Sequence, residues 1–318
     1  MTRTFRYLRL SLTSACSMRC TYCRPPGFKP AQEAALLDAA ELETVVRHLA
    51  DRHGLTKVRL TGGDPTARRD LVEIIERLAR IPAIRDLAMT TNGLTLARSA
   101  RDYRRAGLHR VNVSLDSLKP EVFAQITGLD ALDRVKAGIE AALDAGLRPL
   151  RLNTVVLAGR NDGEAIDLIS FAASLGAEIR FIELMPMGPT AANWAADYVS
   201  AQAVRDRIAP AVTHWEPLDR RRESARNYRL TLKDGRSVTV GFITPMSVPF
   251  CDSCDRLRLT ADGRIFPCLM DGPRGSYLAA VRPRFDPDEF DRLLHEAWIA
   301  KPLIHPTLGS GVMTAVGG

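Results

Sequence analysis

The sequence between residues 7 and 184 contains six short apolar runs, and longer amphipathic stretches lie between them. Strands alternating with helices in this way predict βα units and a parallel sheet. Six units are too few for a closed eight-stranded barrel, so the pattern predicts an α/β fold with an incomplete (β/α)6 TIM-type barrel. We expect its site at the C-terminal ends of the strands. The predicted strands are 7–12, 57–61, 87–91, 110–115, 148–157 and 178–184, and the predicted helices are 38–52, 70–80, 96–106, 131–145 and 164–175.

The alternation stops after Met185, and a different pattern follows. One helix is predicted at 201–208, and two β-hairpins come next, each around an Asp-Gly turn. The sequence therefore predicts a partial barrel over residues 1–210 and a smaller, hairpin-rich C-terminal domain over residues 211–318. The predicted hairpin strands are 228–232 with 237–242 and 257–260 with 265–267, and the last predicted helices are 277–281 and 287–300.

Composition narrows the functional classes. The 318-residue chain is 46% hydrophobic, which is enough for a large core. It has no run of eighteen apolar residues and no apolar leader at its start, so we expect a cytoplasmic protein without membrane contact. The net charge of +7 indicates an anionic partner, either a phosphate-rich small molecule or a nucleic acid.

The six cysteines divide into two sets of three. Cys16, Cys20 and Cys23 form C-x3-C-x2-C, and Cys251, Cys254 and Cys268 form C-x2-C-x13-C. In a reducing cytosol such thiols are expected to bind metal or act in redox chemistry rather than to form disulfides. Three ligands leave one coordination position open, which suits an iron-sulfur cluster with a free iron. A zinc knuckle is the alternative, but the histidines show no ligand-like spacing to either set. The second hairpin is expected to bring Cys254 and Cys268 together at its open ends.

The first cysteine set carries a family resemblance. The run Cys16-x3-Cys20-x-Tyr22-Cys23 resembles the signature of the radical S-adenosylmethionine (SAM) enzymes. The segment Thr-Gly-Gly-Asp-Pro at 61–65 resembles the glycine-rich SAM motif of that superfamily. The resemblance implies a 4Fe-4S cluster whose open iron binds SAM, and reductive splitting of SAM to a 5′-deoxyadenosyl radical. The superfamily usually has Glu where this chain has Asp64, so the predicted SAM contact is Gly63 rather than Asp64.

The second set resembles a narrower family. The run Cys251-x2-Cys254-x-Arg256-x-Arg258, with Cys268 downstream, resembles the second-cluster motif of the GTP 3′,8-cyclase family, which acts first in molybdenum-cofactor (molybdopterin) biosynthesis. The resemblance implies a second 4Fe-4S cluster whose open iron engages the guanine of GTP. It also implies that the radical removes the C3′ hydrogen of GTP, that the carbon radical adds to C8, and that reduction gives 3′,8-cyclo-7,8-dihydro-GTP. Other segments resemble the family in order and spacing, namely 7–11, 90–93, 111–116, 180–185 and the terminal Gly317-Gly318.

Site residues follow from the same resemblance. The implied SAM contacts are Tyr22, Gly63, Ser114 and Met185. The implied GTP contacts are Arg9, Arg59, Thr90, Arg256 and Arg258, with Arg151 at a position where the family usually has Lys. Guanidinium groups pair well with phosphate oxygens, and several of these arginines interrupt apolar strands. No general acid or base is assigned, and the Gly317-Gly318 tail is implied to act inside the active site.

The resemblance also implies cofactors and partners. These are two 4Fe-4S clusters and SAM, GTP as substrate, an electron-donor protein, and a cyclic pyranopterin synthase that acts on the product. A homodimer is also considered, and no nucleic acid is expected. Two other hypotheses stay open: a peptide-modifying radical SAM maturase with an auxiliary cluster, which usually has more C-terminal cysteines, and a basic zinc-binding module that associates with nucleic acid.

Overall fold

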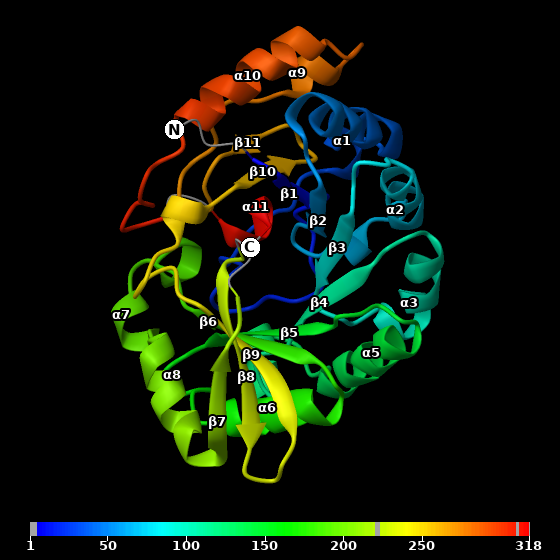
Figure 1. Ribbon diagram of the computed structural model, residues 1–318. Helices are drawn as coiled ribbons and strands as arrows, with labels where there is room; N and C mark the ends of the chain where they lie inside the picture. The colour runs from blue at the N-terminus through cyan, green and yellow to red at the C-terminus, as the bar shows by residue number, and fades with distance from the viewer. Residues whose placement is uncertain (1–4, 220–222, 310–311, 318) are drawn as a thin grey trace.

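The computed structural model describes residues 5–219, 223–309 and 312–317. Over these residues one sheet of eleven strands forms, in the order β11-β10-β1-β2-β3-β4-β5-β6-β9-β8-β7. The sheet curves into a ring, and helices cover its outer face (Figure 1). The two end strands are not paired with each other, so the barrel is open, and the predicted fold class is confirmed.

The six predicted βα units are present, and all neighbouring strands from β1 to β6 are parallel. One short helix was not predicted: α4 (Pro120–Thr127) has Pro120 in its first turn and ends at Gly128. The strands are β1 (Tyr7–Ser11), β2 (Lys57–Thr61), β3 (Asp86–Thr91), β4 (Arg110–Ser114), β5 (Arg151–Val156) and β6 (Glu178–Glu183). The other helices of these units are α1 (Ala39–His53), α2 (Leu71–Ala79), α3 (Leu96–Arg105), α5 (Leu132–Asp144) and α6 (Ala165–Ser174).

Helix α1 shows how local sequence directs these elements. Asp38 and Glu41 form a reciprocal capping box at its start, and Gly54 ends it in the left-handed conformation. Leu42 and Leu49 lie two turns apart on one helical face and are fully buried in the core between helices and sheet. Capping therefore sets the ends of the helix, and the apolar face sets its orientation.

The C-terminal hairpins extend both edges of the barrel sheet. Strand β9 (Ser237–Ile243) pairs parallel with β6 and antiparallel with β8 (Ala225–Leu232), and β7 (Val212–Pro217) forms the edge. Strand β10 (Arg256–Thr260) pairs parallel with β1 and antiparallel with β11 (Ile265–Phe266). Both predicted hairpins are confirmed, but the sequence did not predict that each would continue the barrel sheet. The domain boundary at residue 210 stays a prediction.

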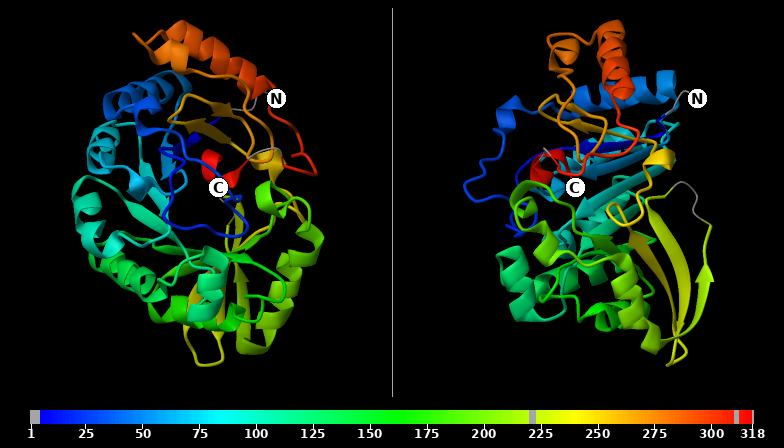
Figure 2. Two further views of the ribbon diagram at one scale, coloured as in Figure 1. Left: turned by 180° about the vertical axis from the view of Figure 1, so that it is seen from behind. Right: turned by 90° about the vertical axis from the view of Figure 1, so that its left-hand side faces the viewer.

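The remaining helices lie around and inside the ring. Helix α10 packs beside α1, where Asp291 lies 2.7 Å from the ring nitrogens of both His48 and His53. Helix α11 lies at the centre of the ring (Figure 2), and the Ser11 hydroxyl of β1 donates to its Ala315 carbonyl at 3.3 Å. No helix among the described residues combines the length and apolar character needed to cross a membrane. The helices in this group are α7 (Trp194–Asp197), α8 (Ala201–Ile208), α9 (Leu278–Val281), α10 (Pro287–Ile299) and α11 (Met313–Val316).

Alternation along the strands creates the space for a site. On β1, Leu8 and Leu10 are fully buried in the outer core, whereas Tyr7 and Arg9 line an interior cavity. Successive side chains on a strand point to opposite faces, so this polar set faces inward. In closed eight-stranded barrels the interior is filled by apolar side chains. Here polar and cationic residues occupy the inward positions instead, and a cavity remains.

Candidate functional site

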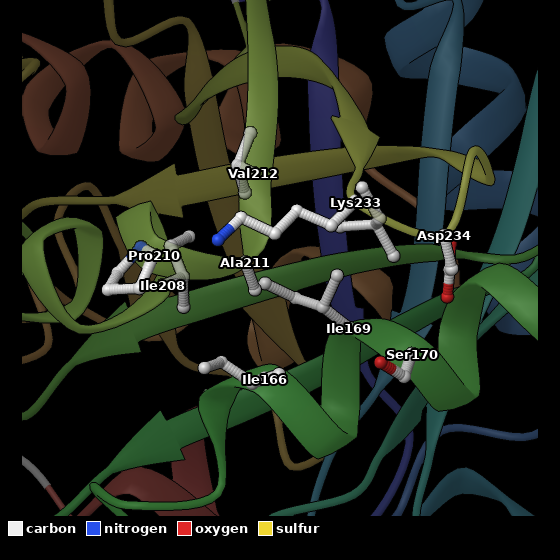
Figure 3. Close-up of a pocket in the computed structure, with 10 residues that line it drawn as sticks. Ile166, Ile169, Ser170, Ile208, Pro210, Ala211, Val212, Lys233 and Asp234 are labelled. Atoms are coloured by element: carbon white, nitrogen blue, oxygen red, sulfur yellow. The ribbon is translucent and has the colours of Figure 1, made fainter.

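The interior cavity brings together every residue that the sequence predicted to bind metal, SAM or GTP. It is lined by Tyr22, Gly63, Ser114 and Met185, by Arg9, Arg59, Thr90, Arg151, Arg256 and Arg258, and by Cys16, Cys20, Cys23, Cys251, Cys254 and Cys268. A second cavity lies on the outside, between α6, α8 and the β8–β9 turn, and its lining is mainly apolar (Figure 3). It contains none of the predicted residues. The interior cavity is therefore the candidate site.

The first cysteine set lies on the loop that follows β1. All three thiols are free and partly buried. Burial raises the pKa of the Cys16 thiol, and the nearby Asp64 adds to this effect. Burial also raises the pKa of Cys23 to about 12, with contributions from Cys16 and Asp116. Thiolates at these positions need a bound cation, so the loop fits a metal cluster better than a free nucleophile.

The glycine-rich segment packs directly on this cysteine loop. The Gly63 amide donates to the Thr13 carbonyl at 2.7 Å. A Cβ atom at Gly63 would lie 2.4 Å from the Ala15 carbonyl oxygen, a contact that real side chains do not make. Glycine at this position is thus required for two backbones to meet, apart from any contact with a ligand.

Asp64, at the position where the resemblance led us to expect Glu, is buried, and its carboxylate is hydrogen-bonded to other protein groups. Its carboxylate accepts hydrogen bonds from the Thr66 amide at 2.9 Å, the Asn92 amide at 2.6 Å and the Thr91 hydroxyl at 3.0 Å. These contacts join the loop after β2 to the loop after β3. The shorter carboxylate therefore shapes the site, and it is absent from the cavity lining.

Three arginines form a row across neighbouring strands, which we call the arginine row: Arg258 on β10, Arg9 on β1 and Arg59 on β2. They are register partners and point to the same side of the sheet, with about 4.8 Å between strands. Burial lowers the pKa of Arg9 to about 9, and repulsion from the charge of Arg258 contributes to this decrease. Burial is also the main reason that the pKa values of Arg59 and Arg258 fall to about 10. Burying three guanidinium charges side by side costs folding free energy when no anion neutralises them. The row is therefore well suited to bind a polyanion.

Several buried polar atoms around the row have no hydrogen-bond partner within the described protein. They are Arg59 Nε, Thr90 Oγ1, Asn112 Nδ2, Asn153 Oδ1 and Arg180 Nε, and all five residues line the cavity. Buried polar atoms without partners are rare in folded proteins, so this set indicates a polar ligand.

Arg151, at the position where the resemblance led us to expect Lys, forms ion pairs with two glutamates. Its Nε donates to Glu178 at 2.5 Å, and its Nη2 lies 3.6 Å from Glu223. Arg180 forms an ion pair of 2.7 Å with the same Glu223. Arg151 therefore lines the cavity as part of an ion-pair network, unlike Arg59, for which no protein acid lies within ion-pair distance in the described structure.

The second cysteine set lies at the other end of the strands. Cys251 and Cys254 precede β10, and Cys268 follows β11. Because β10 runs parallel to β1 and β11 runs antiparallel to it, these cysteines lie at the N-terminal end of β1. The prediction that the whole site lies at the C-terminal strand ends is thus wrong for this set. Four residue steps along β1 separate the two ends by about 13 Å.

The charges around the second set differ from those around the first. Burial raises the pKa of the Cys254 thiol, but Arg256 and Lys301 outweigh it, so that the pKa is lowered overall. The Cys251 thiol has a raised pKa, mainly from burial. The Arg256 guanidinium stacks over the Phe250 ring at 4.7 Å, which holds it beside the cysteines.

The C-terminal tail reaches the arginine row. Arg258 Nη1 donates to the Gly317 carbonyl at 2.6 Å. Gly317 has a φ of 78°, and a Cβ atom there would lie 2.4 Å from Thr61 Cγ2. A side chain at Gly317 would thus be both strained and obstructed. Gly318 lies outside the described residues.

Sequence reasoning missed several residues of this cavity. Asn112, Asn153 and Arg180 line it, and each is a polar residue on an otherwise apolar strand. The same signal supported the assignment of Arg9 and Arg59, which came from the family resemblance, and it could have found these three. His305, which also lines the cavity, gave no such signal, and neither did Lys301 beside it, because both follow α10 at a distance in sequence from both cysteine sets.

Comparisons with known proteins place the chain among named families. The radical SAM superfamily model matches residues 10–172, and the model for molybdenum cofactor synthesis C matches residues 177–307. A GTP 3′,8-cyclase of Pelotomaculum thermopropionicum is 43% identical over 96% of this chain and 94% of its own length. The GTP 3′,8-cyclase of Heliobacterium modesticaldum is 37% identical over 99% of this chain and 98% of its own length.

Solved structures show a similar fold at low identity. Streptococcus suis SuiB bound to precursor peptide SuiA superposes with a TM-score of 0.68 at 14% identity, over 96% of this chain and 66% of that one. SuiB bound to S-adenosylmethionine gives a TM-score of 0.63 at 16% identity, over 95% of this chain and 67% of that one. At this identity the likeness concerns the fold alone.

Proposed function

The chain belongs to the GTP 3′,8-cyclase family of radical SAM enzymes, and we propose that it converts GTP to 3′,8-cyclo-7,8-dihydro-GTP, the first step of molybdenum-cofactor synthesis. The observation that carries the proposal is the pair of cysteine sets at opposite ends of one cavity, with the arginine row between them. The names of the relatives support the substrate and the cyclisation.

The donor chemistry of the cavity fits two iron-sulfur clusters. Each set offers three thiols, and three thiolates on a four-iron cube leave one iron for another molecule. When bound, the first cluster and SAM supply a 5′-deoxyadenosyl radical. We assign that role to Cys16, Cys20 and Cys23, and we assign Cys251, Cys254 and Cys268 to a second cluster that faces the guanine.

The residues near the first set are arranged to hold SAM. The Tyr22 hydroxyl donates to Asp116 at 2.7 Å, which fixes its ring beside the cysteines. Ser114 ends β4, and Met185 follows β6, so both reach the cavity from the same C-terminal side as Gly63. We propose that these four residues bind SAM there.

The residues between the two sets are arranged to hold GTP. The arginine row can neutralise the triphosphate, and Arg256 lies next to the second set, where the guanine is proposed to bind. Thr90 adds a free hydroxyl on β3. Fixed groups on strands hold the ribose toward SAM and keep water out, which is the main contribution a protein can make to radical chemistry. No acid-base pair is required.

Other parts of the proposal concern partners. We propose an electron-donor protein, transfer of the product to the synthase of the next step, a homodimer and a cytoplasmic location. These stay predictions. The roles of Arg151 and of the C-terminal tail in catalysis belong to the same group.

The two other hypotheses make different predictions. SuiB, which was solved bound to a precursor peptide, shares the fold, but a buried row of arginines favours phosphate over a peptide. A zinc-binding module would be colourless, whereas two filled clusters give a brown protein with about eight irons. Iron and sulfide analysis after anaerobic purification separates zinc from iron-sulfur chemistry.

The proposal is tested by turnover of protein reconstituted anaerobically with iron and sulfide. With SAM, a reductant and GTP, we expect 5′-deoxyadenosine and a cyclised nucleotide in equal amounts by liquid chromatography and mass spectrometry. ATP is the matched control and should give no cyclised product. Failure with GTP together with turnover of a peptide would overturn the proposal in favour of a maturase.

A further inference from the structure

Lys301, in the segment that follows α10, lies beside the second cysteine set. This side chain is 9% exposed. Its Nζ donates to the Arg256 carbonyl at 2.6 Å and to the Pro267 carbonyl at 2.7 Å, and its charge interacts with the Cys254 and Cys268 thiols. Its contacts therefore lie beside both cysteines that flank the β10–β11 hairpin.

Two of the three donors of the Lys301 ammonium are used by backbone carbonyls on either side of the β10–β11 hairpin. No carboxylate that the structure describes forms an ion pair with it, although it is buried. The negative charge nearest to it is that of Cys254 and Cys268 once they are thiolates. The ammonium is thus placed to serve the cysteines rather than the substrate.

His305 makes the second connection. Its backbone amide acts to lower the pKa of the Cys251 thiol, against the larger effect of burial. Its ring nitrogens lie 2.7 Å from the Pro245 carbonyl and 2.8 Å from the Pro306 carbonyl. The ring anchors the segment to the loop after β9, so the amide is held at the sulfur. Residues 301–305 thus present an ammonium and a backbone amide to the second cysteine set.

The first set has the opposite surroundings. The carboxylates of Asp64 and Asp116 lie near Cys16 and Cys20, and both are buried. Hydrogen bonds to cluster sulfurs and positive charge raise the reduction potential of an iron-sulfur cluster, and nearby negative charge lowers it. Arg24 also donates to the Cys16 carbonyl at 3.1 Å, so the first set faces two carboxylates and one guanidinium, whereas the cations Lys301 and Arg256 act on the second set.

We propose that Lys301 and the His305 amide position the second cluster and hold its reduction potential above that of the first. Lys301 is a positioning residue, since it touches the cysteines and not the substrate. The proposal rests on the second cluster of the proposed function. Its consequence is a division of redox roles: the cluster that must cleave SAM is the stronger reductant, and the one that faces GTP stays at a higher potential.

The test uses two full-length backgrounds that each keep one cluster. One replaces Cys16, Cys20 and Cys23 by Ala, and the other replaces Cys251, Cys254 and Cys268 by Ala. Lys301→Met is introduced into both, and iron content and midpoint potential are measured by titration followed by electron paramagnetic resonance. Lys233→Met, an exposed lysine on the β8–β9 turn, is the matched control.

We expect Lys301→Met to lower the midpoint potential or the iron content of the second cluster and to leave the first unchanged. Lys301→Gln, which keeps an N–H donor without the charge, should fall between Met and wild type. Unchanged potential and full iron in the second-cluster background would overturn the inference, as would equal loss of both clusters, which marks a general folding role. Absence of a second cluster from the wild-type protein would instead overturn the proposed function and the inference with it.

Discussion

Arg59→Met tests the arginine row with effects of opposite sign on stability and binding. Burial lowers the pKa of Arg59 from 12.5 to about 10, which corresponds to about 3 kcal/mol. Because the folded-state pKa of this base is lowered, the charged guanidinium costs folding free energy at any pH below about 10. Methionine fills similar space without charge. The variant without GTP should therefore unfold about 5 °C higher than wild type at pH 7.5.

The same change should weaken GTP binding. Hydrogen bonds between charged groups contribute about 1.5–3 kcal/mol each, so loss of one such contact gives a Kd about 10- to 100-fold higher. Anaerobic calorimetry measures the Kd and differential scanning fluorimetry the melting temperature. Arg69→Met, which removes an exposed arginine, is the matched control and should change neither. An unchanged Kd, or a melting temperature that falls, would refute the reasoning.

Three further predictions follow from single contacts. Cys16→Ala should abolish SAM cleavage, measured as 5′-deoxyadenosine, and retained cleavage would remove the first set from the cluster. Gly63→Ala should lower both the melting temperature and SAM affinity, because its Cβ would collide with the Ala15 carbonyl, and wild-type values for both would contradict this packing. Burial opposes ionisation of Asp291, but the two histidines of α1 hold its pKa below the usual range. Its stabilising effect is thus present above pH about 4 and lost as the pH falls through the lowered pKa. Asp291→Asn should lower the melting temperature more at pH 7 than at pH 3, and equal loss at both would exclude the ionic contribution.

Much of the fold could be predicted from local sequence. The strand β2 begins and ends where predicted, because an apolar run bounded by turns specifies a strand without help from distant residues. Helix α4 was not predicted because it is short, and the proline at its start and the glycine after it are as common in loops as at helix ends. Parallel pairing of β10 with β1 could not be predicted, because it joins residues far apart in sequence and leaves no local pattern.

The residues of the candidate site could be predicted from the sequence, but their positions relative to one another could not. Cys16, Arg9 and Arg258 were found from motifs and from charges on apolar strands, and all line one cavity. Their spacing followed only from the sheet: the parallel β10 places the second set at the opposite end from the first. Lys301 could not be predicted because its hydrogen-bond partners are two backbone carbonyls, which no residue pattern encodes.

The central claim is that a radical made at one end of the cavity attacks a GTP held from the other end. It is tested most directly with GTP carrying deuterium at C3′, incubated with SAM and reductant. The account predicts that the recovered 5′-deoxyadenosine contains that deuterium, at one atom per molecule of cyclised product. Deoxyadenosine without deuterium, formed alongside cyclised GTP, would contradict it.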